Sequence, residues 1–201
     1  VNGLALQYVS NVLKSNRDVV MNAVKNNWSA LQFASEELRN DNDFMQAAVA
    51  VNGLALQYAS DGLKSYGEVV LAAVKQNGYA LKFASNELKN NKEFVLSAVA
   101  QNGLALRQAS DNLKQNDKDI LLLLVAHSPG ALQYASDKLK NDKEVVMAAV
   151  KKNGFALQFA SNELKRDREF VLYAVEQSGK ALLYASKGLK KEREVVLTAV
   201  R

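Results

Sequence analysis

One sequence pattern recurs eight times along this 201-residue chain, at a spacing of 25 residues with a single step of 26. Internal repetition of this kind indicates modules that cannot bury their apolar faces alone and therefore stack on their neighbours. A serine marks the same point of every unit: Ser10, Ser35, Ser60, Ser85, Ser110, Ser136, Ser161 and Ser186. The units are residues 1–25, 26–50, 51–75, 76–100, 101–126, 127–151, 152–176 and 177–201.

Each unit has the spacing of two short helices. In the third unit, the sequence predicts a first helix over 54–64 and a second over 67–75. Apolar residues follow helical spacing in both. The expected buried stripes are Ala55, Leu56, Ala59 and Leu63 in the first helix and Val69, Val70, Ala73 and Val74 in the second. The second helix is apolar around most of its circumference, so we expect it to lie between neighbours.

Turn residues separate the predicted helices. Gly78 follows the second helix of the third unit, where we expect a left-handed residue that ends the helix. Between the two helices, Ser or Asn precedes an acid by three residues, as in a capping box. The pairs are Ser15 with Asp18, Asn40 with Asp43, Ser65 with Glu68, Asn90 with Glu93 and Asn141 with Glu144. In the last two units we expect Asp167 and Glu192 to cap instead.

These features predict an all-α fold, namely an α-solenoid or superhelix of tandem short helix–turn–helix repeats. Proline occurs once, at Pro129, which favours helix throughout. Helices of about ten residues are marginal alone in water, so stacking must stabilise them. We expect residues 1–201 to form a single repeat array and a fragment of a longer protein, since it starts and stops within the pattern. Uncapped ends would leave end-to-end self-association open.

A second period overlies the first. Tyr8 and Phe33 alternate at one position and Val19 and Phe44 at another, which suggests a building block of two units. Unit five departs from the pattern. It has Gln108 in place of the aromatic residue, one inserted residue, a leucine run over 121–124, and the sequence His-Ser-Pro-Gly over 127–130.

The repeat motif ALQYASxxLKxDxEVVLAAVKxNG resembles that of the family called domain of unknown function 4116. Residues 131–154, ALQYASDKLKNDKEVVMAAVKKNG, carry it most clearly, and the resemblance covers all eight units. The resemblance implies a helical repeat protein without assigned catalytic residues, so none can be transferred to this chain. The insertion in unit five departs from the family pattern.

The composition argues against several kinds of site. The chain has no cysteine and a single histidine, His127, so we expect no disulfide, no metal site, no cofactor and no catalytic centre. The serines lack the neighbouring base that a nucleophile needs. We place them inside the first helix, beside the core. No apolar run is long enough to cross a membrane, and we expect a soluble, intracellular protein.

A basic residue recurs near the end of each first helix. A row of this kind could bind a phosphate backbone, or it could simply balance the negative end of the helix. An acidic residue also recurs once per repeat, just beyond the basic row. The charges of the two rows cancel, which favours the second interpretation. The basic row consists of Lys14, Arg39, Lys64, Lys89, Lys114, Lys140, Lys165 and Lys190.

Aromatic residues recur at the margin of the predicted core. They could stack on bases, but alternation of Tyr and Phe favours packing between units. The row consists of Tyr8, Phe33, Tyr58, Phe83, Tyr134, Phe159 and Tyr184.

The leading hypothesis for function is a non-catalytic scaffold that binds another protein. Solenoids offer long surfaces for peptides and proteins. The expected contact surface is the polar face of the first helices, together with His127 in the irregular unit. Its candidate residues are Gln7, Gln32, Gln57, Lys82, Arg107, Gln133 and Gln158. The alternative is sequence-independent binding of nucleic acid through the basic row, favoured by the net charge of +5.

Overall fold

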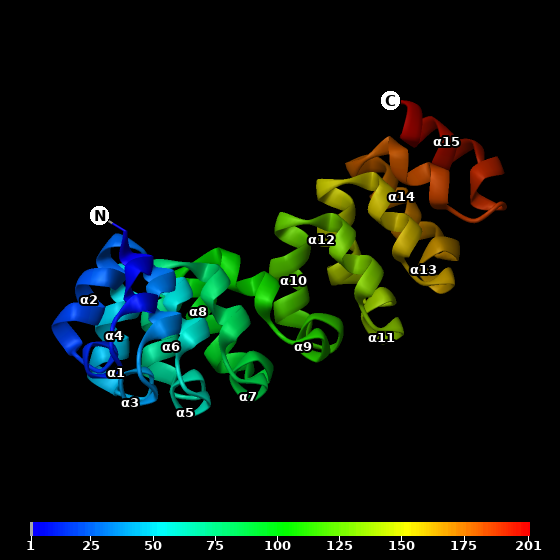
Figure 1. Cartoon of the computed structure of the whole chain (residues 1–201). Coiled ribbons are helices and arrows are strands. Elements are labelled where there is room, and N and C mark those ends of the chain that lie inside the picture. The colour runs from blue at the N-terminus through cyan, green and yellow to red at the C-terminus, as the bar shows by residue number, and fades with distance from the viewer. Residues whose placement is uncertain (1) are drawn as a thin grey trace. The chain divides into compact units, whose positions relative to one another are not determined.

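The computed structural model describes residues 2–201, and these form helical elements without a strand (Figure 1). The predicted all-α repeat fold is confirmed. The chain forms two compact units, one ending at Ser110 and one covering Asp111–Arg201. We call them the N-terminal and C-terminal stacks and describe each by itself. None of the described helices is long and apolar enough to span a bilayer.

Each repeat contributes three helical pieces, where the sequence predicted two. A six-residue 3-10 helix comes first, then a short helix, then an α-helix of eight to ten residues. The 3-10 helices are η1 (Gly3–Tyr8), η2 (Trp28–Phe33), η3 (Gly53–Tyr58), η4 (Gly78–Phe83), η5 (Gly103–Gln108), η6 (Pro129–Tyr134), η7 (Gly154–Phe159) and η8 (Gly179–Tyr184). The short helices are α1 (Asn11–Lys14), α3 (Glu36–Arg39), α5 (Asp61–Lys64), α7 (Asn86–Asn90), α9 (Asp111–Asn116), α11 (Asp137–Lys140), α13 (Asn162–Arg166) and the 3-10 helix η9 (Leu189–Lys191). The long helices are α2 (Arg17–Asn26), α4 (Asn42–Val51), α6 (Gly67–Gln76), α8 (Lys92–Gln101), α10 (Lys118–His127), α12 (Lys143–Lys152), α14 (Arg168–Gln177) and α15 (Arg193–Val200).

The predicted first helix is interrupted at the serine of each repeat. In repeat three, Ala59 and Ser60 are extended, with ψ of 156° and 159°. The Ser60 backbone N–H donates to the Arg39 carbonyl of the preceding repeat at 2.9 Å, and its Oγ accepts from the Leu63 N–H at 3.3 Å. The serine is therefore the N-cap of a new helix rather than a residue inside one. The apolar spacing could not show this, because a continuous helix would place the same residues on one face.

The predicted capping boxes are displaced by one residue. Ser15, Asn40, Ser65 and Asn141 end the short helices as C-caps. The following residue caps the long helix: Asp41 Oδ1, for example, accepts from the Phe44 N–H at 2.8 Å. Asp167 caps α14 as predicted, whereas Glu192 occupies the cap position of α15 without a side-chain cap bond.

The glycines that follow the long helices are not left-handed. No described residue has a positive φ, and these glycines begin the 3-10 helices. Their role is close approach: a Cβ on Gly53 would lie 2.2 Å from the Ala73 carbonyl oxygen in α6. Glycine is needed here because a neighbouring backbone occupies the space of a side chain.

The long helices carry the core of each stack. In Figure 1 the short helices α1, α3, α5 and α7 lie along one edge of the N-terminal stack, while α4 packs against α6 and α6 against α8. The predicted stripes of repeat three are buried, from Ala55 through Val74. Burial of each such Leu or Val contributes about 1.5–3 kcal/mol, so stacking supplies the stability that single repeats lack.

The inserted residue of repeat five is absorbed in its short helix. Helix α9 covers Asp111–Asn116, where its counterparts are three to five residues long. As a result, the carbonyl that accepts the next serine N–H belongs to Gln115 and not to Lys114. The long helix and the repeat-to-repeat hydrogen bond therefore continue after the insertion.

Candidate interaction surface

The candidate residues of the predicted contact surface lie on the 3-10 helices. Most of these side chains are exposed, and Gln57 is half-buried. They occupy the fifth residue of each 3-10 helix, so the stack presents them at regular intervals within each unit. In repeat eight the same position holds Leu183, whose side chain is 58% exposed. Leu183 could have been recognised from the sequence, because GKALLY replaces GLALQY there, but the predicted polar row ended at Gln158.

Apolar side chains share this surface with the polar row. Tyr79, Leu104 and Phe155, each the second residue of its 3-10 helix, are between 37% and 44% exposed. The rings of Trp28 and Tyr58 lie 6.0 Å apart between neighbouring repeats. This surface thus mixes polar groups with partly exposed aromatic rings, the composition typical of protein interfaces.

The predicted aromatic row follows the same edge. Phe33, Tyr58, Phe83, Phe159 and Tyr184 are half-buried, whereas Tyr8 and Tyr134 are exposed. The Tyr184 ring meets the Phe155 ring edge-on at 6.0 Å, between repeats seven and eight. These positions agree with packing between repeats, and the rings of this pair also remain accessible from outside.

The basic row is half-buried along most of its length. Lys14 through Lys165 are intermediate in exposure, and Lys190 is exposed. Three members pair with an acid on the first turn of their own short helix: Arg39 with Glu36 at 3.9 Å, Lys64 with Asp61 at 3.6 Å and Lys114 with Asp111 at 2.8 Å. Lys165 and Lys190 instead donate to the carbonyls of Gln158 and Leu183, both at 2.6 Å. Local partners therefore use much of the hydrogen-bonding capacity of this row.

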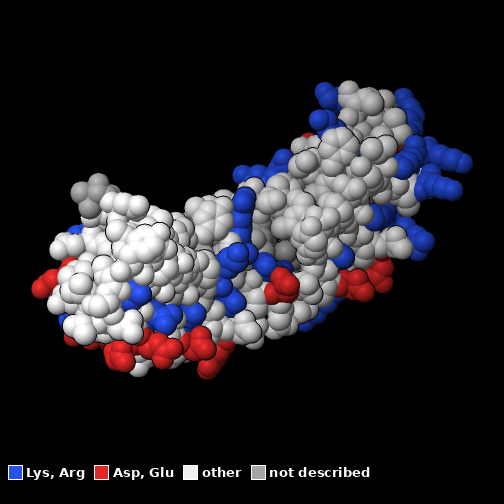
Figure 2. Space-filling view, in the orientation of Figure 1, with Lys and Arg blue, Asp and Glu red and all other residues white. Residues whose placement is uncertain are grey.

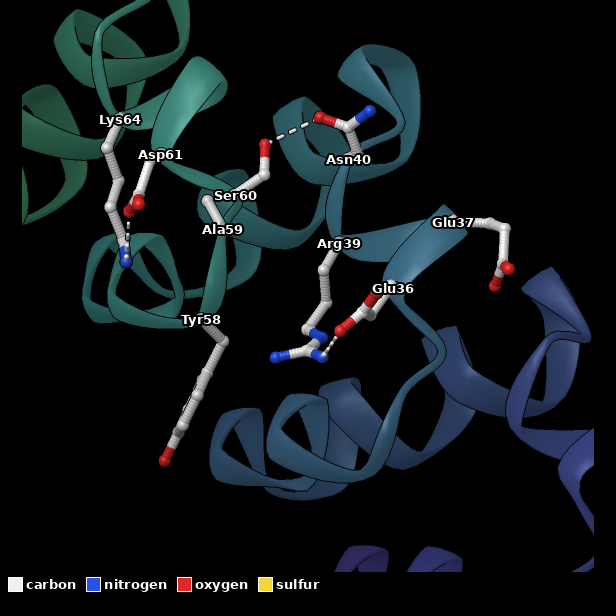
Figure 3. Close-up of a pocket in the computed structure, with 9 residues that line it drawn as sticks. All are labelled: Glu36, Glu37, Arg39, Asn40, Tyr58, Ala59, Ser60, Asp61 and Lys64. Atoms are coloured by element: carbon white, nitrogen blue, oxygen red, sulfur yellow. Dashed lines mark hydrogen bonds and ion pairs between the residues drawn. The ribbon is translucent and has the colours of Figure 1, made fainter.

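A groove opens between the short helices of repeats two and three. It has a volume of about 560 Å³ and is lined by Arg39, Asn40, Tyr58, Ser60 and Lys64, among others. Figure 3 shows Arg39 turned toward Glu36, Lys64 turned toward Asp61, and the Ser60 hydroxyl donating to Asn40 Oδ1 at 2.7 Å. The Nε of Arg39 is buried and makes no hydrogen bond. Acids and bases are mixed in this groove, so its charge is nearly balanced.

The serine row forms hydrogen bonds from one repeat to the next. Besides the Ser60–Asn40 bond, the hydroxyls of Ser110 and Ser161 donate to Asn90 and Asn141 at 2.7 and 2.5 Å.

His127 lies at the end of α10, exposed, with Nδ1 2.9 Å from the Leu123 carbonyl oxygen. Among residues 2–201, its one side-chain hydrogen bond is to the backbone of its own helix and not to a residue of the polar row.

An ion-pair ladder joins the starts of successive long helices. Lys118 Nζ lies 2.8 Å from both Asp142 and Glu144, and Lys143 Nζ lies 2.6 Å from Asp167. Arg168 continues the ladder to Glu192 at 2.9 Å. The two carboxylates raise the pKa of Lys118 to about 12. This ladder was not predicted from the sequence. Its sequence pattern is a base that recurs 24 residues before an acid.

The Asp167 carboxylate serves both as helix cap and as ladder partner, which allows a test. Hydrogen bonds from Lys143 and from the Phe170 N–H lower the pKa of Asp167. We expect Asp167→Asn to keep the cap, as Asn91 does for α8, and to destabilise by less than about 1 kcal/mol. Asp167→Ala should cost about 1 kcal/mol or more.

The pH dependence of this test follows from the direction of the shift. A lowered folded-state pKa contributes stability that is present above the unfolded pKa, about 4, and is lost as pH falls through the folded value. Urea denaturation at neutral and acidic pH should therefore show wild type and Asp167→Asn converging in acid. A difference that persists in acid would contradict the assignment.

Comparison with known proteins identifies the repeat. Five segments match the family described as Domain of unknown function (DUF4116): residues 1–39, 22–64, 67–114, 117–165 and 167–201. Every match spans more than one 25-residue repeat. No curated protein and no solved structure matches the chain significantly. Because the matches cover nearly the whole chain, it belongs to the DUF4116 family of repeat proteins.

Proposed function

We propose that this chain is a non-catalytic scaffold whose 3-10 helices bind another protein. The observation that carries the proposal is the surface on which polar side chains such as Gln32 and Arg107 alternate with partly exposed rings such as Tyr79. These side chains project from elements whose other residues form the core. The exposure of these side chains is therefore not needed for stability. A partner would meet the side chains at a fixed spacing.

The arrangement of polar groups supports binding over catalysis. An active site needs unlike groups that converge in one pocket, whereas the repeats present the same groups at regular intervals. The hydroxyls of Ser60, Ser110 and Ser161 act in hydrogen bonds between repeats. Local pairing of Arg39, Lys64 and Lys114 with acids likewise favours a protein partner over a phosphate backbone.

Charge reversal on the proposed surface tests this function. Lys82 and Arg107 are exposed on η4 and η5, and Lys82 Nζ lies 6.0 Å from the centroid of the Phe83 ring. We expect Lys82→Glu with Arg107→Glu to abolish most of the capture of a partner from extracts of the native cells. Nuclease treatment should leave the capture by the wild-type chain intact.

A matched control is the double reversal Lys25→Glu with Lys75→Glu. Both lysines are exposed near the ends of long helices and lie outside η4 and η5. This variant has the same net charge as the test variant and should capture the partner normally. Capture that survives reversal at Lys82 and Arg107 would show that the proposed surface is wrong, and loss after nuclease would favour nucleic acid instead.

A further inference from the structure

The groove between the short segments of repeats seven and eight differs in charge from its counterpart in Figure 3. It has a volume of about 590 Å³ and occupies the equivalent place five repeats further along the sequence. Its polar lining consists of Asn162, Lys165, Arg166, Tyr184, Ser186 and Lys187. The two grooves therefore lie at equivalent positions of the backbone and differ in the side chains that line them.

Substitutions at equivalent positions replace two of the three acids of the earlier groove. The third acid, Glu37, is kept as Glu163, which accepts a hydrogen bond from Asn141 at 2.6 Å and does not line the groove of repeats seven and eight. Asn162 stands where the earlier groove has Glu36, and Lys187 stands where it has Asp61. No carboxylate lines the later groove, while three cationic side chains do. Figure 2 shows Lys and Arg side chains gathered over this end of the C-terminal stack. The groove consequently carries a positive charge that is not balanced within it.

The basic groups of this groove are not consumed by ion pairs. Among residues 2–201, no carboxylate lies within ion-pair distance of Lys165, Arg166 or Lys187. The Lys165 ammonium donates to the Gln158 carbonyl, and burial lowers its pKa. An anionic group placed in the groove would therefore meet one partly desolvated charge, that of Lys165, beside the exposed charges of Arg166 and Lys187. Attraction to a partly desolvated charge is stronger than in open water.

The short segment of repeat eight differs from that of repeat three in local fold as well as in charge. Asp61 begins the short α-helix α5, and an acid at this position favours the helix N-terminus. In repeat eight a lysine holds the position, Lys187, and the segment forms only the 3-10 helix Leu189–Lys191. Gly62 and Gly188 follow in the two repeats alike, so the glycine does not account for the difference.

An apolar hollow lies beside the basic groove on repeat eight. It has a volume of about 480 Å³ and is lined by Phe155, Leu182 and Leu183, with Lys180 and Lys190 also contributing. Lys180 Nζ lies 5.5 Å from the centroid of the Phe155 ring, and the Tyr184 ring that borders the groove meets Phe155 edge-on. Groove and hollow thus share η8, and each is lined by one ring of this edge-on pair.

We propose that the groove and the hollow together bind an acidic peptide segment that carries an apolar side chain. The hollow fits the apolar side chain, and its lysines together with Lys165, Arg166 and Lys187 fit flanking carboxylates. Three cationic side chains in the groove beside a separate apolar hollow match a chain that carries both acidic and apolar side chains, so the occupant we propose is a peptide and not a membrane. This site lies on repeats seven and eight and does not depend on the surface proposed above for η4 and η5.

The probe is a short fluorescent peptide in which leucines alternate with pairs of glutamates, titrated by anisotropy against the full chain. We expect Arg166→Glu with Lys187→Glu to weaken its binding about tenfold or more, as reversal of two exposed charges predicts. The charge-matched control Lys25→Glu with Lys75→Glu should bind normally. Circular dichroism melts verify that both variants remain folded.

Three outcomes would overturn the proposal. Equal weakening of peptide binding in the test and control variants would show that the effect comes from the change in net charge alone. A peptide with serine in place of leucine that binds as tightly would remove the role of the hollow. Binding of phosphatidylserine vesicles without binding of the peptide would assign the surface to a membrane. Because the test variant leaves Lys82 and Arg107 intact, its failure is distinguishable from failure of the η4–η5 surface.

Discussion

Phe44→Ala should lower the free energy of unfolding of the N-terminal stack by about 3–5 kcal/mol, as truncation of a buried phenylalanine does. Phe44 is 2% exposed in α4, and the Arg17 guanidinium of the preceding repeat lies 5.6 Å from its ring centroid. The substitution removes apolar contacts and leaves a cavity at a point where repeats one and two meet. Trp28, the only tryptophan, lies in the same repeat and reports the transition by fluorescence during urea denaturation.

Tyr8→Ala is the control for this prediction. Tyr8 is also aromatic but 84% exposed, so its truncation should change stability by no more than about 0.5 kcal/mol. A Phe44→Ala variant within about 1 kcal/mol of wild type would show that the repeat can close the cavity, and that Phe44 does not hold repeats one and two together.

Gly53→Ala should destabilise by about 1–3 kcal/mol or more, the cost of inserting an atom into a filled space. The added Cβ would lie 2.2 Å from the Ala73 carbonyl oxygen and 3.1 Å from the Asn77 nitrogen. Both neighbours are backbone atoms at the end of α6, so rotation of a side chain cannot relieve the contact. Either η3 or the end of α6 must move, and core packing around Leu56 would loosen.

Gly62→Ala provides a control in the same repeat. A Cβ at Gly62, inside α5, would meet only the Ser60 Oγ at 3.9 Å, which is an ordinary contact distance. Because alanine restricts the unfolded chain, this variant should be neutral or more stable by about 0.4–1 kcal/mol. Chemical denaturation of the two variants decides the matter: equal losses would contradict the explanation by close approach.

The candidate surface was predictable in outline, because a polar row at a fixed point of the repeat must lie outside an apolar stripe. Gln7 and Arg107 are exposed for this reason. The contrast in charge between the two equivalent grooves could not be predicted from the sequence, because Lys187 is distant in sequence from Lys165 and Arg166. Only stacking brings a short segment of one repeat beside that of the next.

The sequence by itself determined the repeat length, the helical class and the buried residues, because burial at helical spacing depends on local periodicity. Leu56 and Val74 are buried as their spacing requires. Tertiary structure alone decided where each helix begins. Ser60 breaks the predicted first helix because its N–H pairs with Arg39 of another repeat, and Gly53 avoids a clash with Ala73 rather than a strained φ. Both depend on contacts between separate elements, which periodicity along one element cannot reveal.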